Sequence, residues 1–348
     1  MTGALYLREG LTLKRARQAD GEEVRALQRD LRATGYLRRG IDGDFGPMTA
    51  RAVRSFSYDL LHNDGSGGHD GAAPVAVTAY NRGRVSQVTD EVDQGLAACL
   101  AEMAADAAFP KLPESPDPRA ANETARETIA GTVSTVAPVP WLTQMLRQES
   151  GLRHFNEPGA GDDDRFVVVG FDRNRRGVPE QVTSRGYGLG QFTLFHHPPR
   201  QEEVDAFIAD PMGNLDTAIQ EFREKFDRFV NGPTSGTRAD DRIAEIGEGE
   251  LRLCKYEQDD PRYMTDCRAC AQEAERRTIE MGEPYYPGAA GRYRLTQYYR
   301  SPERYRDVPA RAAIGCDWPY AARRYNGSGP NSYHYQTRIL LRLAGREW

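Results

Sequence analysis

Hydrophobic residues at helical spacing mark the most distinctive stretch of the chain, the segment WLTQMLRQESG over residues 141–151. Val139, Leu142 and Met145 are three residues apart, and Glu149 follows Met145 by four. These positions share one face of an α-helix. A Pro at the start and a Gly after the end favour the same helix. The pattern predicts a helix whose apolar face ends at Glu149.

The predicted surroundings of Glu149 suit acid chemistry. Apolar neighbours and the negative end of a helix dipole hold a carboxyl proton more tightly than water does. A general acid needs such a proton near neutral pH. The alternative is that Glu149 is a solvated residue at a helix end.

A second helical pattern occupies residues 21–58. Val24, Leu27 and Leu31 form one apolar face, and a further helix is predicted after the loop at residues 40–49. This loop carries two acids but no downstream Glu, so it does not match an EF-hand calcium loop. Its Asp-Gly steps favour turns instead.

These residues carry a family resemblance. The sequence VRALQRDLRATGYLRRGIDGDFGPMTARAVRSF resembles the small three-helix peptidoglycan-binding module of many cell-wall enzymes. Its LQ, GY, IDGDFGP and AVRSF parts follow in the expected order, and Ser57 stands where the family usually has Gln. The resemblance implies wall binding, which we assign to four loop residues, Asp42, Asp44, Phe45 and Gly46.

The remaining pattern predicts two domains. Residues 63–75 are rich in Gly and Asp, residues 75–85 carry β-type side chains, residues 92–103 fit an amphipathic helix, and residues 106–130 are rich in Pro, Ala and Glu. We therefore expect a peptidoglycan-binding domain at 1–105 with its core motif at 21–58, a connector at 106–130, and a catalytic domain at 131–348.

Net charge and hydropathy limit the kinds of partner that we expect this protein to bind. The 348 residues carry a net charge of −5, which argues against general nucleic-acid binding, and no apolar run is long enough to span a membrane. Residues 1–62 hold 11 Lys and Arg against 8 Asp and Glu, a weak basic excess that suits an anionic polymer. Arg8 and Glu9 interrupt the first apolar stretch, so we expect no standard export signal.

Four further segments together resemble the lytic transglycosylases and goose-type lysozymes. They are Glu149-Ser150, the GYGLGQ segment at 186–191, the NLDTA segment at 214–218 and the RYNGSG segment at 324–329. Gly190 replaces the usual Met, and the NLDTA segment lacks the family's Gly. The spacing after Glu149 is also long, and the apolar run 166–171 predicts an inserted β-hairpin there.

The resemblance implies a mainly α fold, in which a small three-helix peptidoglycan-binding domain joins a lysozyme-like α-rich domain with a small β insertion. It implies cleavage of the β-1,4 bond between N-acetylmuramic acid and N-acetylglucosamine, with Glu149 as general acid and base and no cofactor. The substrate-binding residues that we assign on this basis are Ser150, Tyr187, Gln191, Phe192, Tyr325, Asn326 and Tyr333. Tyr335 competes with Tyr333 for the same role, and a core position is the alternative for Tyr333.

Alternatives to a lytic transglycosylase stay open. A hydrolytic muramidase would need a second carboxylate, for which Asp163, Asp164 and Asp172 are candidates within the acidic segment 162–172. A solvated acidic loop is the other interpretation, and we favour it. A non-catalytic wall-binding protein is the alternative from another class. Without an export signal, we expect a phage endolysin released by a holin, or a secreted antibacterial effector with an immunity protein or a secretion spike as partner.

Four of the five cysteines lie in the predicted catalytic domain. They are Cys254, Cys267, Cys270 and Cys316. A single CxxC motif is weak evidence for zinc, because structural zinc sites of this type usually have two. Disulfides would suit a protein that acts outside the cytoplasm, so we favour them over zinc, and free thiols remain a third interpretation.

Overall fold

The computed structural model describes residues 4–15, 21–66, 73–132, 136–173, 175, 177–231, 241–289, 291–296 and 301–347. The chain forms two compact units, here called unit 1 and unit 2. Unit 1 comprises Met1–Ala125 and Arg153–Leu215, and unit 2 comprises Arg126–Leu152 and Asp216–Trp348. This division differs from the domain boundaries expected from the sequence, because residues 153–215 pack with the N-terminal part of the chain.

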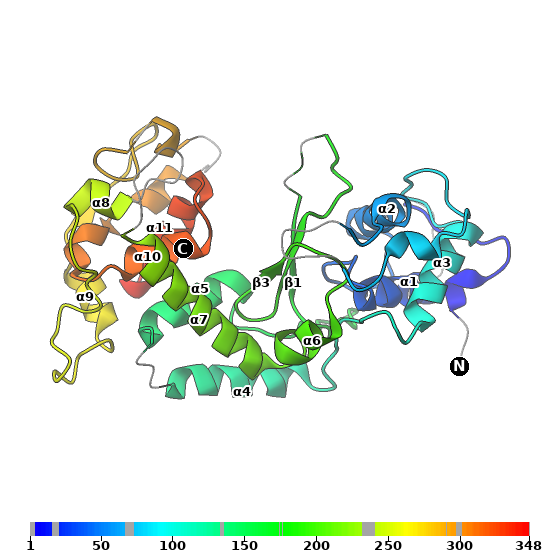
Figure 1. Cartoon of the computed structure of the whole chain (residues 1–348), viewed down its shortest axis with the longest axis horizontal. Helices are drawn as coiled ribbons and strands as arrows, with labels where there is room; N and C mark the ends of the chain where they lie inside the picture. Colours follow the sequence, from blue (N-terminus) through cyan, green and yellow to red (C-terminus); the bar gives the residue numbers. More distant parts are fainter. Residues whose placement is uncertain are drawn as a thin grey trace. The chain divides into compact units, whose positions relative to one another are not determined.

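Figure 1 labels the elements along the chain. The fold is mainly α, as predicted, with a small three-stranded antiparallel sheet. The elements that begin in unit 1 are η1 (Leu5–Leu7), α1 (Gly21–Ala33), α2 (Pro47–His62), η2 (Val77–Tyr80), α3 (Gln94–Ala105), α4 (Pro118–Gly131), β1 (Val169–Asp172), β2 (Ser184–Tyr187), β3 (Phe192–Leu194), α6 (Gln201–Glu203), the π-helix η3 (Val204–Ile208) and α7 (Pro211–Phe229). The unit boundary falls inside α4 and again inside α7.

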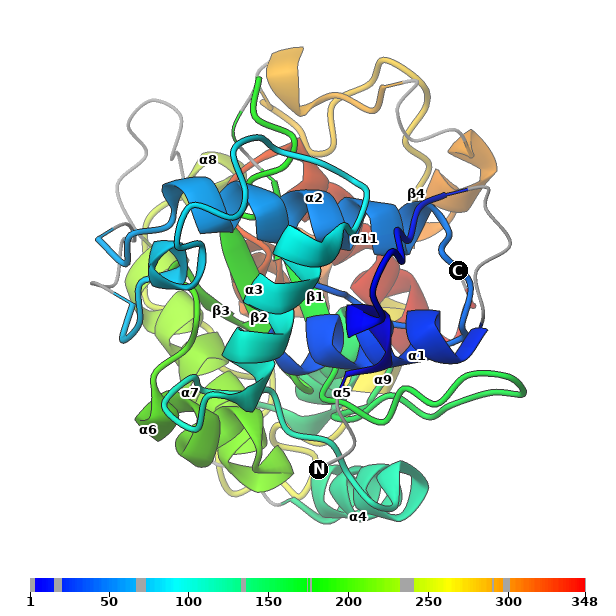
Figure 2. The ribbon, with the colours of Figure 1, turned by 90° about the vertical axis from the view of Figure 1, so that its right-hand side faces the viewer.

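The helices α1, α2 and α3 gather around one hydrophobic core (Figure 2). The apolar face of α1 is buried as the periodicity predicts, with Val24, Leu27 and Leu31 almost completely removed from solvent. Pro47 occupies the first turn of α2, where its missing N–H breaks no helical hydrogen bond. The amphipathic pattern at 92–103 corresponds to α3, which supplies the third helix of this core.

Two segments differ from their sequence-based interpretation. The β-type residues at 75–85 form the 3₁₀ helix η2 and turns instead of a strand. Residues 118–131, expected to be part of a connector, form the helix α4. Pro118 is its first residue, a position at which proline favours a helix, and the many Ala and Glu residues that follow are good helix formers.

The predicted β insertion is confirmed. Strands β1 and β2 pair antiparallel, with Val169 opposite Tyr187 and Asp172 opposite Ser184, and β3 extends the sheet on the other side of β2. The sheet packs with apolar residues of η3 and with Ile41 of the N-terminal module. The hairpin is therefore anchored to the module's own loop.

A buried ion pair fixes this anchorage. Arg32 of α1 donates from Nε to both carboxylate oxygens of Asp164, each at 3.0 Å, and both side chains are almost fully buried. Arg32 Nη2 also donates to the Val167 carbonyl oxygen at 2.9 Å, and the Gly40 N–H donates to Asp164 at 2.9 Å. A buried charge is tolerated only when it is paired and hydrogen-bonded, and both conditions hold here.

Unit 2 is helical with one short β-ladder. Its remaining elements are α5 (Val139–Ser150), α8 (Asp241–Ile246), α9 (Cys267–Glu273), β4 (Arg276–Arg277), η5 (Gly291–Tyr293), η6 (Pro302–Tyr305), β5 (Val308–Pro309), η7 (Arg311–Ile314), α10 (Trp318–Tyr325) and α11 (Pro330–Leu343). Helix α11, at the red end of Figure 1, packs against α5, α9 and α10. Within the described residues, no helix has both the length and the apolar character needed to cross a membrane.

Candidate functional site

The helix α5 matches its prediction closely. It runs from Val139 to Ser150 with a proline in its first turn, and Gly151 follows in the left-handed conformation at φ 71°. Leu142 and Met145 are fully buried, whereas Glu149 is only partly buried at the C-terminal end of the same helix. The carboxyl group thus lies where apolar core gives way to accessible surface.

Two tyrosines of unit 2 lie around Glu149. Tyr335 of α11 donates its hydroxyl hydrogen to Glu149 Oε1 at 2.6 Å. Burial is the main cause that raises the pKa of Tyr335 well above its ordinary value, and the charge and hydrogen bond of Glu149 raise it further. For Tyr325, at the end of α10, burial and the carboxylates of Glu221 and Glu149 raise the pKa in the same direction. Both phenols therefore remain protonated donors across the neutral range.

Glu221 is a neighbour that the sequence analysis did not identify. It lies on α7, its charge raises the pKa of both Tyr325 and Tyr335, and its side chain pairs with Lys225 at 3.0 Å. Glu221 belongs to none of the quoted motifs. The search for a second carboxylate concentrated instead on the acids that follow Glu149 in the sequence.

The structure decides between two tyrosines of α11. Tyr333 is 1% exposed and stacks against Tyr285 at 5.2 Å between ring centroids, inside a cluster of core tyrosines. Tyr333 thus occupies the core position given as its alternative, and a substrate-binding role for it stays a prediction without structural support. Tyr335, its competitor in sequence, is the tyrosine that contacts Glu149.

The other two predicted residues of unit 2 lie at helix ends. Ser150 is buried, and its hydroxyl donates to the Leu146 carbonyl oxygen at 3.1 Å. Asn326 caps the end of α10 and is exposed. An exposed amide at this position is available to a ligand, so the acetamido-binding role of Asn326 stays a prediction.

Two of the four resembling segments meet in unit 1. Asn214 of α7 is fully buried, accepts a hydrogen bond from the Gly190 N–H at 2.9 Å and donates to the Tyr187 carbonyl oxygen at 3.0 Å. Gly188 between them has φ 69°, and a Cβ there would lie 2.7 Å from the Asn214 amide. Only glycine fits this position.

The side chains of residues 187–192, around the Gly188 turn, differ in how far they are exposed to solvent. Tyr187 is fully buried in the core, so its ring has no surface for a ligand, and its assignment as a substrate-binding residue stays an untested prediction. Gln191 is partly exposed at φ 52° and donates to the Gly188 carbonyl oxygen at 2.8 Å. Phe192 is partly buried and packs edge-to-face on Phe207, with centroids 4.9 Å apart.

The acidic segment of the hydrolase alternative is mainly structural. Asp164 is buried against Arg32, so neither a catalytic role nor a solvated position holds for it. Asp163 pairs with Arg25 at 3.2 Å on the surface. Asp172 ends β1, is exposed and accepts a hydrogen bond from the Ser184 hydroxyl at 3.3 Å. For Asp163 and Asp172 the catalytic hypothesis stays a prediction.

The loop of the N-terminal module is organised by one buried glutamine. Gln28 Nε2 donates to Asp42 Oδ1 at 2.8 Å and to the Asp44 carbonyl oxygen at 3.0 Å, while its Oε1 accepts from the Gly43 N–H at 2.8 Å. Asp42 also accepts from the Asp44 N–H at 3.0 Å, which confirms the turn role of the Asp-Gly step. Phe45 is buried, and Gly46 caps α2.

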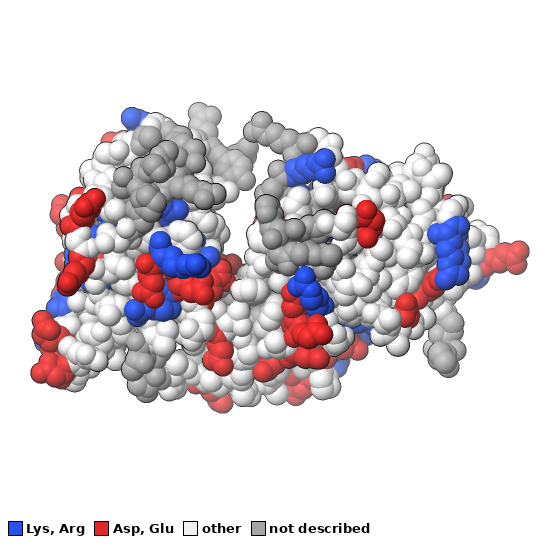
Figure 3. Space-filling view, viewed as in Figure 1, with Lys and Arg blue, Asp and Glu red and all other residues white. Residues whose placement is uncertain are grey.

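In this arrangement only some of the loop residues assigned to wall binding are accessible to a ligand. The side chains of Asp42 and Asp44 are exposed, whereas Phe45 serves the core. On the face drawn in Figure 3, Lys and Arg are interspersed with Asp and Glu instead of forming one continuous basic patch.

The cysteines are free thiols, including Cys99 of α3. The favoured disulfide hypothesis is therefore not met, and the third interpretation of free thiols fits instead, with every cysteine but the partly exposed Cys254 buried. Burial raises the pKa of Cys316 to about 12, so this thiol is unreactive as a nucleophile. In the part of the chain that the structure describes, no group of three or more His, Cys, Asp or Glu side chains is placed to hold a metal ion.

Comparison with known proteins supports the module. Residues 20–58 match the family described as "Putative peptidoglycan binding domain", which covers α1, the loop held by Gln28 and most of α2. Curated proteins and solved structures gave no match to the chain. The N-terminal match associates the protein with peptidoglycan and the cell wall.

Proposed function

We propose that this protein cleaves the glycan strands of peptidoglycan, with Glu149 as general acid and base. The observation that carries the proposal is the hydrogen bond from Tyr335 to a half-buried Glu149 at the end of an apolar helix face. A tyrosine that holds a carboxyl group in place gives an acid a fixed direction. The wall-binding module supplies the substrate class.

The reaction that we favour is that of a lytic transglycosylase. Glu149 gives its proton to the glycosidic oxygen as the bond from that oxygen to C1 of N-acetylmuramic acid breaks. The C6 hydroxyl of the same sugar attacks C1 and returns its proton to Glu149. The products are a 1,6-anhydro sugar and a free 4-hydroxyl group, with no water consumed. One carboxyl group is sufficient for this reaction.

A hydrolytic muramidase is the second candidate, and Glu221 is a further carboxylate to test for it besides Asp163 and Asp172. The charge of Glu221 raises the pKa of Tyr325 and Tyr335, as that of Glu149 does. A second carboxylate in this place could activate a water molecule. Mass spectrometry of released muropeptides separates the candidates, because only the transglycosylase leaves 1,6-anhydro ends.

The decisive experiment measures turbidity loss of purified murein sacculi by wild type and by Glu149→Gln. General acid–base help is worth about 10²–10⁴-fold, so the variant should lose nearly all activity while still folding and binding sacculi. Glu224→Gln is the matched control, because Glu224 is an exposed carboxylate on α7. Sacculi that wild type binds without cleaving would establish the non-catalytic alternative. The expected delivery route and the immunity protein or secretion spike stay predictions.

A further inference from the structure

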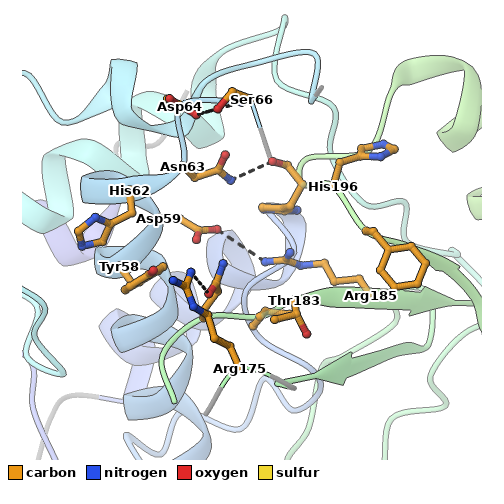
Figure 4. Close-up of a pocket in the computed structure, with 14 residues that line it drawn as sticks. Tyr58, Asp59, His62, Asn63, Asp64, Ser66, Arg175, Thr183, Arg185 and His196 are labelled. Atoms are coloured by element: carbon orange, nitrogen blue, oxygen red, sulfur yellow. Dashed lines mark hydrogen bonds and ion pairs between the residues drawn. The ribbon is translucent and has the colours of Figure 1, made fainter. Parts of the chain in front are cut away.

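Unit 1 contains a pocket of about 750 Å³ that no role described so far uses (Figure 4). The C-terminal end of α2 and the loop after it form one wall, and the segment before β2, β2 itself and residues 195–197 form the other. The volume lies within the range of roughly 300–1,000 Å³ typical of small-molecule sites. The size suits a ligand of one or a few sugar rings.

A buried arginine lies at the base of this pocket. Arg185 of β2 is 2% exposed, and its Nη2 lies 3.9 Å from Asp59 Oδ2 without a hydrogen-bond partner among the described residues. Figure 4 shows the guanidinium directed toward Asp59 across the pocket. A buried N–H donor without a partner costs free energy, and a ligand oxygen would satisfy it.

The adjacent histidine adds a second buried polar group. His197 lines the same pocket and is nearly buried, and its ring packs edge-to-face on Tyr36 with the centroids 4.9 Å apart. Burial and the nearby charge of Arg185 lower the pKa of His197 well below its ordinary value, so the ring is neutral. A neutral imidazole offers one donor and one acceptor.

The walls of the pocket carry balanced charges and one exposed aromatic ring. Two cations, Arg175 and Arg185, are matched by two acids, Asp59 and Asp64. The ring of Phe195 is 45% exposed on the same pocket. A charge-balanced pocket with donors, acceptors and a flat apolar face suits a neutral saccharide, whose hydroxyl and acetamido groups pair with the polar side chains while a ring face covers the phenyl group.

We propose that this pocket is a saccharide-binding site for N-acetylated sugars of the glycan strand, separate from Glu149. The choice of N-acetylated sugars rests on the proposed function. Phe195 provides the stacking surface, and Arg185 Nη2, which has no hydrogen-bond partner among the described residues, provides a polar contact together with the His197 ring. The pocket thereby adds a second point at which unit 1 holds the strand, besides the module loop.

The test uses the full chain with Glu149→Gln, which prevents turnover, and chitotetraose as the probe. Hydrogen exchange should show protection of residues 58–66 and 181–197 on binding. Phe195→Ala should remove this protection and weaken binding at this pocket by about tenfold, the upper range for an aromatic contact. Phe195→Tyr should restore both, because it keeps the ring. Phe229→Ala is the matched control, since Phe229 is an equally exposed phenylalanine of unit 2 (43%).

The outcomes separate this proposal from the function on which it rests. Absence of protection in the two segments, or protection that Phe195→Ala leaves unchanged, would overturn the pocket while Glu149-dependent cleavage of sacculi could still stand. Phe195-dependent protection, together with a wild-type protein that binds sacculi without cleaving them, would uphold the saccharide site and overturn the proposed enzyme.

Discussion

The acidic loop of unit 1 and the end of α5 in unit 2 each present a carboxylate that the sequence offers for catalysis, and they are built for different purposes. Asp164 accepts hydrogen bonds from Arg32, from the Gly40 N–H, from the Asn156 amide and from the Phe166 N–H. It is buried and its charge is matched. Such an acid stabilises a fold, and its burial keeps a substrate from reaching it.

Glu149 has the opposite construction. It is partly exposed, it accepts a hydrogen bond from the neutral hydroxyl of Tyr335, and the charge of Glu221 contributes to the raised pKa of the same phenol. Two carboxyl groups with different surroundings are typical of an acid–base site, whereas a carboxylate locked against arginine is typical of a structural link. The two acids thus differ in burial and in the charge of their partner, and the proposed role of Glu149 rests on this difference.

The largest expected effect concerns the structural acid. Asp164→Asn leaves Arg32 as a buried charge without its counter-ion, so the free energy of unfolding should fall by about 3–5 kcal/mol. Urea unfolding followed by circular dichroism measures this loss. Glu149→Gln should unfold close to wild type. If Asp164→Asn were as stable as Glu149→Gln, the distinction between the two carboxylates would collapse.

The next largest effect concerns Tyr335, the hydrogen-bond donor to the candidate catalytic acid Glu149. Tyr335→Phe removes a hydrogen bond to a carboxylate, worth about 1.5–3 kcal/mol, so cleavage of sacculi should slow by about tenfold to hundredfold. The raised pKa of Tyr335 keeps this phenol protonated in the working range, so the loss in the variant reports the missing hydrogen bond and not a lost ionisation of Tyr335.

Tyr333→Phe is the control for that change, because Tyr333 belongs to the same helix but to the core cluster. It should cleave sacculi at close to the wild-type rate. A larger loss for Tyr333→Phe than for Tyr335→Phe would remove the evidence that Tyr335 positions Glu149.

A smaller effect extends the comparison to the module loop. Gln28→Ala removes the acceptor of the Gly43 N–H and the donor to Asp42 and Asp44, at a cost of about 1–3 kcal/mol for the group left unpaired. Binding to sacculi should weaken because the loop loses its fixed shape. Cosedimentation with sacculi measures it, with the exposed Gln94→Ala as control. Unchanged binding would show that the loop does not recognise the wall.

Much of the local structure could be predicted from the sequence. Helices α1 and α5 follow from apolar residues at spacings of three and four, and β1 follows from the apolar run at 166–171. The segment 106–130 was misjudged because prolines suggest a connector, although Pro118 sits at the first turn of α4, where proline is compatible with a helix. Composition alone does not record such a position.

The long-range part of the structure was not predictable in the same way. Arg32 and Asp164 are 132 residues apart, and no local pattern announces their contact. Glu149 was identified because its helix carries its own signal, whereas Glu221 and Arg185 acquire their surroundings only through tertiary packing. The assignment of residues 153–215 to unit 1 likewise depends on contacts with the module that local periodicity does not encode.

The smallest expected effect tests whether burial is what separates the acids of the loop. Asp163 is adjacent to Asp164 and also pairs with an arginine of α1, Arg25, at 3.2 Å, but this pair is exposed to solvent. Exposed ion pairs contribute about 0–1 kcal/mol, since water and salt screen them, so Asp163→Asn should shift the urea midpoint only slightly. Added salt should reduce even that shift, while it should leave the loss in Asp164→Asn nearly unchanged. Equal losses at the two positions would mean that the loop depends on its total charge instead of on the buried Arg32–Asp164 pair.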